Sequence, residues 1–207
     1  MASWIDNMEI LKREGLWEGN FLRTLLITYR DKRGKTRKWE AVERIRCKTV
    51  AAVVPFTRAG EFILVRQYRP VVENFVIEFP AGLTPPDEDP KDTAYRELIE
   101  ETGYVSTDIH FLAQGPISSG MSTEDIVFYL ANDAVLADEA LREQFPPDDS
   151  EDIEVIVIPS EGIYEVLSER GSKGDLIDIK VYGLIELSRR YLHELHAKNQ
   201  FTSQRRL

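Results

Sequence analysis

The chain has 207 residues, of which 43% are hydrophobic and 30% charged, so its composition is that of a globular protein rather than a disordered one. Its formal net charge of −10 argues against general binding to nucleic acids or anionic membranes, because both need a basic surface. The single cysteine, Cys47, excludes an intrachain disulfide, and no apolar run approaches the roughly 20 residues of a membrane span, so we expect a cytoplasmic protein.

The first part of the chain is predicted to consist mainly of β-strands. Residues 1–47 are expected to form a small β unit, with strands over residues 21–31 and 36–46 joined by a turn at Gly34. Apolar runs rich in β-branched residues predict three further strands, over residues 49–56, 61–69 and 75–82.

The clearest predicted helix begins after Asp89 and ends at Gly103. Asp89 is a suitable N-cap, Pro90 favours the first turn of a helix, and Gly103 suits the position after the last turn. The rest of the chain is predicted to contain strands over 109–115, 125–133 and 153–158, a loop over 146–151, helices over 160–169 and 180–197, and a tail over 201–207. The fold class is therefore mixed α/β (α+β): an N-terminal antiparallel β unit over 1–47, followed by one α/β/α domain over 48–200.

Three glutamates are expected to lie on one face of this helix. Glu97, Glu100 and Glu101 are three and four residues apart, which places them side by side. Like charges at this spacing repel one another, and Arg96, four residues before Glu100, neutralises only one of them. One interpretation is a solvated acidic surface. The other is a site for a divalent cation such as Mg²⁺, which prefers carboxylate oxygens.

The spacing of residues around the helix favours the cation site. Gly82 is followed after five residues by Glu88, and after seven more by the run Arg96-Glu97-Leu98-x-Glu100-Glu101-x-Gly103. This pattern resembles the signature of the Nudix hydrolases, with Tyr104 where that family prefers an aliphatic residue. The resemblance implies a Nudix α/β/α sandwich. It also implies an enzyme that uses Mg²⁺ or Mn²⁺ and water to cleave a nucleoside diphosphate linked to another group.

The same resemblance gives roles to individual residues. It implies that the metal is held by the Ala81 carbonyl and by Glu97, Glu100 and Glu101. Arg96 and Glu100 belong to the catalytic group, with Arg96 orienting the glutamates. For the catalytic base, or a further metal ligand, the resemblance points to the loop 146–151. Glu151 is the first choice there and Asp149 the alternative, because relatives differ over which acid of this loop acts.

Residues 34–46, 63–70 and 77–83 resemble the branch of ADP-ribose pyrophosphatases and ADP-sugar diphosphatases. Members of that branch are homodimers whose N-terminal β units are exchanged between subunits. The resemblance implies these substrate contacts: Trp17 and Trp39 stacked on the adenine, Glu40 accepting from the base amine, and Arg44 and Arg69 on the diphosphate. Four of these five residues have an alternative interpretation. The tryptophans also suit a core or a dimer interface, Arg69 also suits a plain surface position, and Arg44 shares its predicted strand face with Arg46.

The segment 117–125 leaves the preferred substrate open. The branch commonly has a proline where this chain has Ser119, whereas Gly120, Ser122 and Glu124 match. We expect this loop to face the terminal sugar, with Gly120 and Glu124 among the substrate-binding residues. The expected substrate is ADP-ribose or a related nucleoside diphosphate sugar such as GDP-mannose. The alternative is a Nudix protein that binds a nucleotide sugar without cleaving it.

Overall fold

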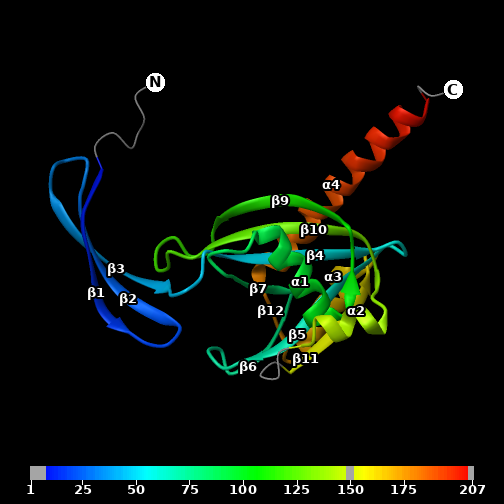
Figure 1. The fold of residues 1–207 in the computed structure, drawn as a ribbon, viewed down its shortest axis with the longest axis horizontal. Coiled ribbons are helices and arrows are strands. Elements are labelled where there is room, and N and C mark those ends of the chain that lie inside the picture. Colours follow the sequence, from blue (N-terminus) through cyan, green and yellow to red (C-terminus); the bar gives the residue numbers. More distant parts are fainter. Residues whose placement is uncertain (1–7, 148–151, 205–207) are drawn as a thin grey trace.

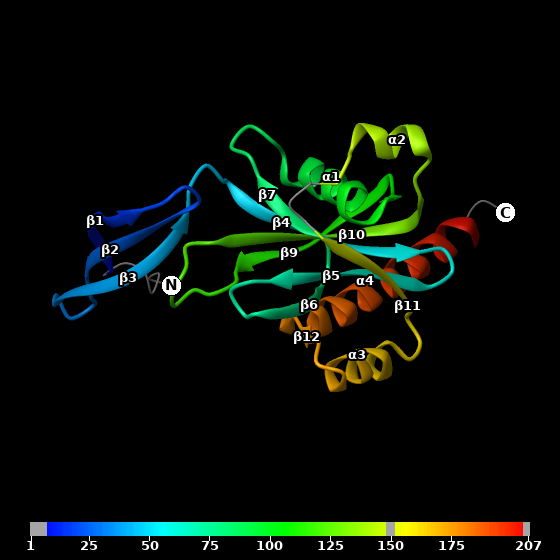
Figure 2. The same cartoon turned by 90° about the horizontal axis from the view of Figure 1, so that it is seen from below.

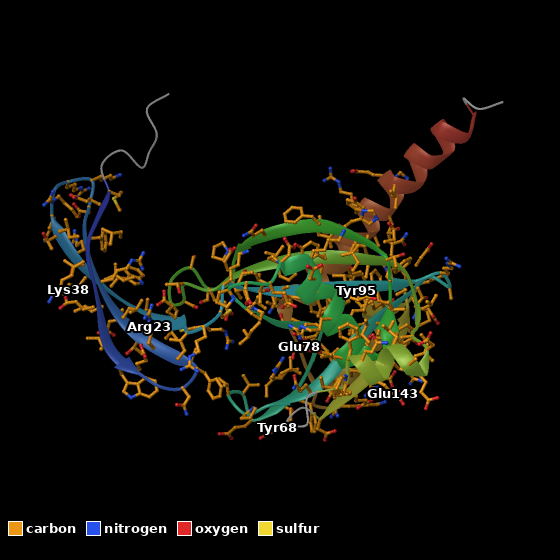
Figure 3. The ribbon with its side chains drawn as sticks, in the orientation of Figure 1. Arg23, Lys38, Tyr68, Glu78, Tyr95 and Glu143 are labelled. Carbon is orange, nitrogen blue, oxygen red and sulfur yellow. The ribbon has the colours of Figure 1, made fainter. Side chains whose placement is uncertain are left out.

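A computed structural model describes residues 8–147 and 152–204 of the chain. The N-terminal β unit is a three-stranded antiparallel sheet that extends from one side of the main body (Figure 1). Figure 3 shows Arg23 on this sheet and Glu78 in the main body. The turn at Gly34 has a φ of 74°, a left-handed conformation that glycine adopts without strain. In sheet order, the three strands are β1 (Glu9–Glu18), β2 (Leu22–Arg30) and β3 (Thr36–Arg44).

Nine strands of the described residues form the sheet of the main body. Its central path runs β12-β6-β5-β4-β10-β8, while β11, β7 and β9 pair with β5, β4 and β10 respectively. β4 runs parallel to β10, and its first half is antiparallel to β7, with Ala52 opposite Ala81. The strands are β4 (Thr49–Thr57), β5 (Glu61–Arg69), β6 (Asn74–Glu78), β7 (Ala81–Thr84), β8 (Tyr104–Val105), β9 (Asp108–Pro116), β10 (Asp125–Leu136), β11 (Ile153–Pro159) and β12 (Leu176–Ile177).

Helices cover both faces of this sheet (Figure 2). On one face Leu98 of α1 clusters with Val53 of β4, and on the other the next β4 residue, Val54, clusters with apolar side chains of α3 and α4. Alternate β4 residues therefore enter opposite layers, which explains why the strand is apolar throughout. The predicted α/β/α sandwich is confirmed. The helices are α1 (Pro90–Thr102), α2 (Glu139–Gln144), α3 (Ile163–Ser172) and α4 (Ile179–Gln204), and none in the described ranges is long and apolar enough to cross a membrane.

The ends of α1 follow from the local sequence. The Asp89 side chain accepts a hydrogen bond of 2.8 Å from the Lys91 backbone N–H, so it caps the helix as predicted. Gly103 has a φ of 72°, and its N–H donates to the Ile99 carbonyl at 2.8 Å. These caps fix the register of the helix and thereby the direction of its acidic face.

Several boundaries differ from the predictions. The strand expected over 75–82 is split into β6 and β7, because Pro80 has no N–H to continue the ladder. α4 continues to Gln204, which is four residues into the expected tail. Arg46 lies beyond the end of β3 with a φ of 59°, so it does not share a strand face with Arg44, contrary to our expectation. β1, β8, β12 and α2 were not predicted as separate elements, since each is short or lacks a clear apolar period.

Candidate active site

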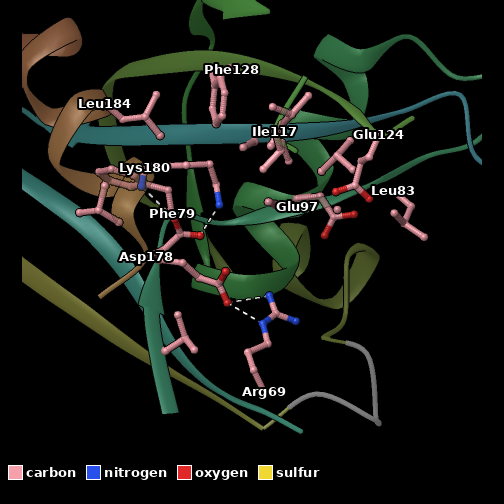
Figure 4. A pocket seen from close by; sticks show the side chains of 18 of the residues that line it. Arg69, Phe79, Leu83, Glu97, Ile117, Glu124, Phe128, Asp178, Lys180 and Leu184 are labelled. Carbon is pink, nitrogen blue, oxygen red and sulfur yellow. Dashed lines mark hydrogen bonds and ion pairs between the residues drawn. The ribbon is translucent and has the colours of Figure 1, made fainter. Parts of the chain in front are cut away.

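A cavity of about 900 Å³ opens beside β7, α1 and the start of α4 (Figure 4). Its wall combines residues from distant parts of the chain, and its apolar lining comes mainly from the sheet and α4. Seven of the catalytic, metal-binding and substrate-binding residues predicted from the sequence line it: Arg44, Arg69, Ala81, Arg96, Glu97, Glu100 and Glu124. The fold therefore brings one wall of acids and several arginines into a single cavity.

Gly82 makes room for the carboxylate of Glu97. A Cβ placed on Gly82 would lie only 1.7 Å from Glu97 Oε1 and 2.0 Å from its Cδ. Any side chain at position 82 would therefore push the carboxylate away, and only glycine lets it approach the backbone of β7. This contact explains why the glycine at the start of the sequence signature stands fifteen positions before the glutamate.

Arg96 lies among three carboxylates. Its Nη1 is 2.8 Å from Glu97 Oε1 and 2.6 Å from Glu100 Oε2, and its Nε is 3.3 Å from Glu88 Oε1. Burial opposes the positive charge, but these carboxylates outweigh it and raise the pKa of Arg96. Burial also opposes the charge of Glu88, yet hydrogen bonds from Thr93 and Arg96 lower the pKa of Glu88. Three carboxylates share one guanidinium, so this group keeps an excess of negative charge.

The loop before β10 is joined to β3 of the N-terminal sheet. The Val42 N–H donates to the Met121 carbonyl at 2.8 Å, and the Thr123 N–H donates to the Val42 carbonyl at 3.0 Å. The Trp39 indole N–H donates to the Gly120 carbonyl at 2.9 Å, and Arg44 forms an ion pair with Glu124. Gly120 and Glu124 thus contact two of the expected substrate-binding residues, Trp39 and Arg44.

The two tryptophans project from opposite faces of the N-terminal sheet. Trp17 lies opposite Thr24 of β2, whereas Trp39 lies opposite Ile27, three residues further along the same strand. Side chains three apart on a strand point to opposite faces. Neither tryptophan lines the cavity, nor does Glu40, which is exposed. One chain therefore does not sandwich a base between its own tryptophans.

The NUDIX domain family matches residues 46–175, more than half of the chain. The chain belongs to the Nudix family. The ADP-sugar pyrophosphatase of Mus musculus is 32% identical over 184 residues, covering 84% of either chain. The ADP-ribose pyrophosphatase of Bacillus subtilis (strain 168) is 31% identical over 137 residues, covering 66% of this chain and 70% of the relative. The crystal structure of an ADP compounds hydrolase shares the fold, with a TM-score of 0.74 at 19% identity over 91% of this chain and 96% of the other. The protein is a Nudix hydrolase, and its expected relationship to these pyrophosphatases is confirmed.

Nudix hydrolases generally need divalent metal ions, and the acidic face of α1 carries the carboxylate oxygens that such an ion prefers. In residues 8–147 and 152–204, no three His, Cys, Asp or Glu side chains form a ready-made metal cage. Arg96 holds both Glu97 and Glu100 by ion pairs, so part of the coordinating capacity of these two carboxylates is occupied. The expected base or ligand Glu151 and the alternative Asp149 lie outside the described residues.

The donor set on α1 nevertheless suits a hard divalent cation. Glu97 and Glu101 lie one helical turn apart, and each exposes only 8% of its surface. Two buried carboxylates at this spacing repel one another, and a cation beside them would offset that cost. The carboxylate of Glu97 lies against Gly82, and the preceding residue, Ala81, also lines the cavity, so its carbonyl is a candidate for a further oxygen donor.

The cavity is also lined by three charged residues that were not identified from the sequence: Glu78, Asp178 and Lys180. Arg69 donates to Glu78 Oε1 from Nε at 2.7 Å and from Nη2 at 2.6 Å. Burial raises the pKa of Glu78, with Arg69 opposing the rise and Asp178 adding to it. Lys180 pairs through its ammonium group with Asp178, and its backbone N–H donates to Asp178 Oδ1 at 2.8 Å. An aspartate before a predicted helix is an N-cap signal, which could have identified Asp178 but not its place in the cavity.

Proposed function

We propose that the protein hydrolyses the diphosphate bond of ADP-ribose or a related nucleoside diphosphate sugar. The products are a nucleoside monophosphate and a sugar phosphate, which are AMP and ribose 5-phosphate when ADP-ribose is the substrate. The observation that carries the proposal is that Glu97 and Glu100 of α1 line a cavity that also contains Arg44 and Arg69, with Glu101 buried one helical turn from Glu97. Acids that can hold a cation and arginines that can hold phosphates are the two groups that hydrolysis of a diphosphate requires.

The metal, Mg²⁺ or Mn²⁺, would be held by Glu97, Glu100, Glu101 and the Ala81 carbonyl, with Glu151 as a possible further ligand. When bound, such an ion neutralises charge on the diphosphate and favours ionisation of the attacking water. Arg96 orients Glu97 and Glu100 through its ion pairs, and these pairs must loosen when the carboxylates turn toward a cation. Glu151, or alternatively Asp149, takes the proton of the water in this proposal.

Arg44 and Arg69 are proposed to bind the diphosphate. Each is already paired with an acid, Arg44 with Glu124 and Arg69 with Glu78. A guanidinium group has five N–H donors, so it can keep a carboxylate on one side and bind a phosphate on the other. Glu124 and Glu78 therefore position the arginines, and they also balance the positive charge of these arginines while the cavity is empty.

We also infer that two chains form a homodimer with exchanged N-terminal sheets. The sheet exposes large apolar side chains, among them Phe21 at 75% and Trp17 at 61%. Because Trp17 and Trp39 project from opposite faces, a base stacked on Trp39 can meet Trp17 only from a second chain. Glu40 would then accept from the amine of the adenine. Sedimentation equilibrium tests the inference, and a monomer at micromolar concentration would contradict it.

The proposed reaction is tested by incubating the protein with ADP-ribose, GDP-mannose or UDP-glucose in Mg²⁺ or Mn²⁺ and separating the products. Release of a nucleoside monophosphate from at least one of them is the expected result. Glu97→Gln should abolish that release, while Glu169→Gln, an exposed glutamate on α3, should not. If the wild-type protein releases no monophosphate but binds a nucleotide sugar in calorimetry, the proposal of hydrolysis fails and a non-catalytic binding function replaces it.

A further inference from the structure

The wall of the cavity formed by β12 and α4 carries an ion pair that the proposed reaction does not use. Asp178 and Lys180 both line the cavity, and in Figure 4 they lie on one side of Glu97 while Glu124 lies on the other. Their side chains are 14% and 35% exposed. Apolar residues surround them, including Ile177, Val181 and Leu184. This part of the cavity is a small group of charges beside the carboxylate of Glu78, which interacts electrostatically with both residues, and apolar side chains surround it.

Both members of the pair keep hydrogen-bonding capacity toward the cavity. Asp178 Oδ1 accepts the N–H that caps α4, and its second oxygen meets the Lys180 ammonium. Each carboxylate oxygen has two lone pairs, and an ammonium group has three donors. The Asp178 carboxylate therefore offers acceptors and the Lys180 ammonium group offers donors, close enough together for one small ligand group to contact both.

A helix cap alone does not account for this arrangement. Asp138 caps α2 in the same way, accepting the Leu141 N–H at 2.8 Å, and no ion pair to Asp138 is found among the described residues. The partly buried ammonium of Lys180 adds nothing to the capping of α4. A partly desolvated donor and acceptor facing a cavity suit a ligand with several hydroxyl groups, because each hydroxyl both donates and accepts.

We propose that Asp178 and Lys180 bind the hydroxyl groups of the sugar on the distal phosphate and thereby select among nucleotide sugars. The proposal rests on the proposed function and deepens it. The loop before β10, which was expected to face the sugar, is joined instead to Trp39 and Arg44, so this proposal places it at the nucleoside end of the substrate. The diphosphate lies at the acidic face of α1, and the remaining end of the cavity, beside α4, receives the sugar.

The test compares substrates that differ in one part only. ADP-ribose and ADP-mannose differ in the sugar, whereas ADP-mannose and GDP-mannose differ in the base. The variants are Asp178→Asn, which keeps an oxygen for the cap of α4, and Lys180→Met, which keeps most of the apolar stem. The matched controls are Asp138→Asn, at the cap of α2, and Lys173→Met, whose ammonium pairs with Glu169 at 2.5 Å outside the cavity.

The expected result is a change in the ratio of kcat/KM for the two sugars and no change in the ratio for the two bases. Sites that hydrogen-bond a substrate lose discrimination when those groups are removed, so we expect the sugar ratio to change by about 10-fold or more. The base ratio should stay within about 2-fold, because the proposed base contacts, Trp39 and Glu40, are untouched. An equal fall for all three substrates would overturn the proposal, since it would indicate a contact with the diphosphate or a structural effect. So would a change of the same size in the controls.

A binding experiment separates this inference from the proposed function. In EDTA, without turnover, calorimetry should show that Asp178→Asn and Lys180→Met change the relative Kd of ADP-ribose and ADP-mannose. This outcome supports the subsite even if the wild-type protein hydrolyses neither compound. Hydrolysis by the wild-type protein with unchanged relative Kd and kcat/KM in both variants would overturn the subsite alone. Absence of binding by the wild-type protein would overturn the subsite as well.

Discussion

The contact between Gly82 and Glu97 gives a sharp test of the proposed metal site. Gly82→Ala adds a single methyl group, and that methyl would lie 1.7 Å from Glu97 Oε1. Gly82 is not among the glycines with positive φ, so alanine is compatible with its backbone. The atoms that the methyl group would meet belong to the end of the flexible Glu97 side chain, so the carboxylate moves and the fold remains.

The size of the displacement follows from the same contact. Ordinary van der Waals contact of a Cβ begins at 3.4 Å, and the added Cβ would lie 1.7 Å from Glu97 Oε1. This oxygen must therefore move away by 1.7 Å, the difference between the two distances. Ligand distances in metal sites vary by only about 0.2 Å, so a carboxylate moved this far no longer binds the ion in its original place. Misplacement of a reacting group by about 1 Å can cost about 100-fold in rate, or about 2.7 kcal/mol. We expect Gly82→Ala to lower kcat by at least that factor.

The assay measures kcat and the Mg²⁺ concentration needed for half-maximal rate, together with the Kd of ADP-ribose in EDTA. Gly82→Ala should lower kcat, raise the required Mg²⁺ and leave the Kd in EDTA unchanged. Gly115→Ala is the matched control, because Gly115 has no heavy atom within 4 Å of an added Cβ. A wild-type kcat and Mg²⁺ dependence in Gly82→Ala would refute the assignment of Glu97, in its position against Gly82, as a metal ligand.

Three further outcomes are expected. Leu98→Ala, at a fully buried position of α1, should lower the free energy of unfolding by about 2–5 kcal/mol in urea denaturation, and a loss below about 1 kcal/mol would contradict the packing described. Trp39→Phe keeps a ring for stacking but removes the hydrogen bond to Gly120, so KM for ADP-ribose should rise more than kcat falls; an unchanged KM would show that this bond does not position the base site. Burial raises the pKa of Glu78 above its ordinary value of 4.5, so stability from its neutral form is present at low pH and is lost as pH rises through the raised value. Thermal melts from about pH 4 to pH 8 test this. The Tm of Glu78→Gln minus the Tm of the wild type should increase with rising pH, and a difference independent of pH would refute the raised pKa of Glu78.

Much of α1 could be predicted from the sequence because its determinants are local. Asp89, Pro90 and Gly103 act within a few residues of themselves, and the acids occupy one face because helical spacing places them there. The apolar character of β4 and β5 likewise identified buried strands. The family signature then indicated the chemistry, since metal-binding acids and a glycine at fixed spacing are contained in one short segment.

The remaining features depended on pairings between distant segments. Nothing local to Trp17 or Trp39 reveals that they project from opposite faces, because that follows from the register of β1 and β3 against β2. Asp178 and Lys180 enter the cavity only because β12 pairs with β6 and brings the start of α4 beside Glu78.

The sequence by itself determined the type of domain, the acidic helix and its glycine, because caps and periodic spacing act within one or two turns of chain. The tertiary structure was needed to show which arginines face the cavity and what lies at the end proposed for the sugar. These features depend on contacts between distant residues, such as Arg44 and Glu124, which are 80 positions apart, and they are set by strand register and packing rather than by neighbouring residues.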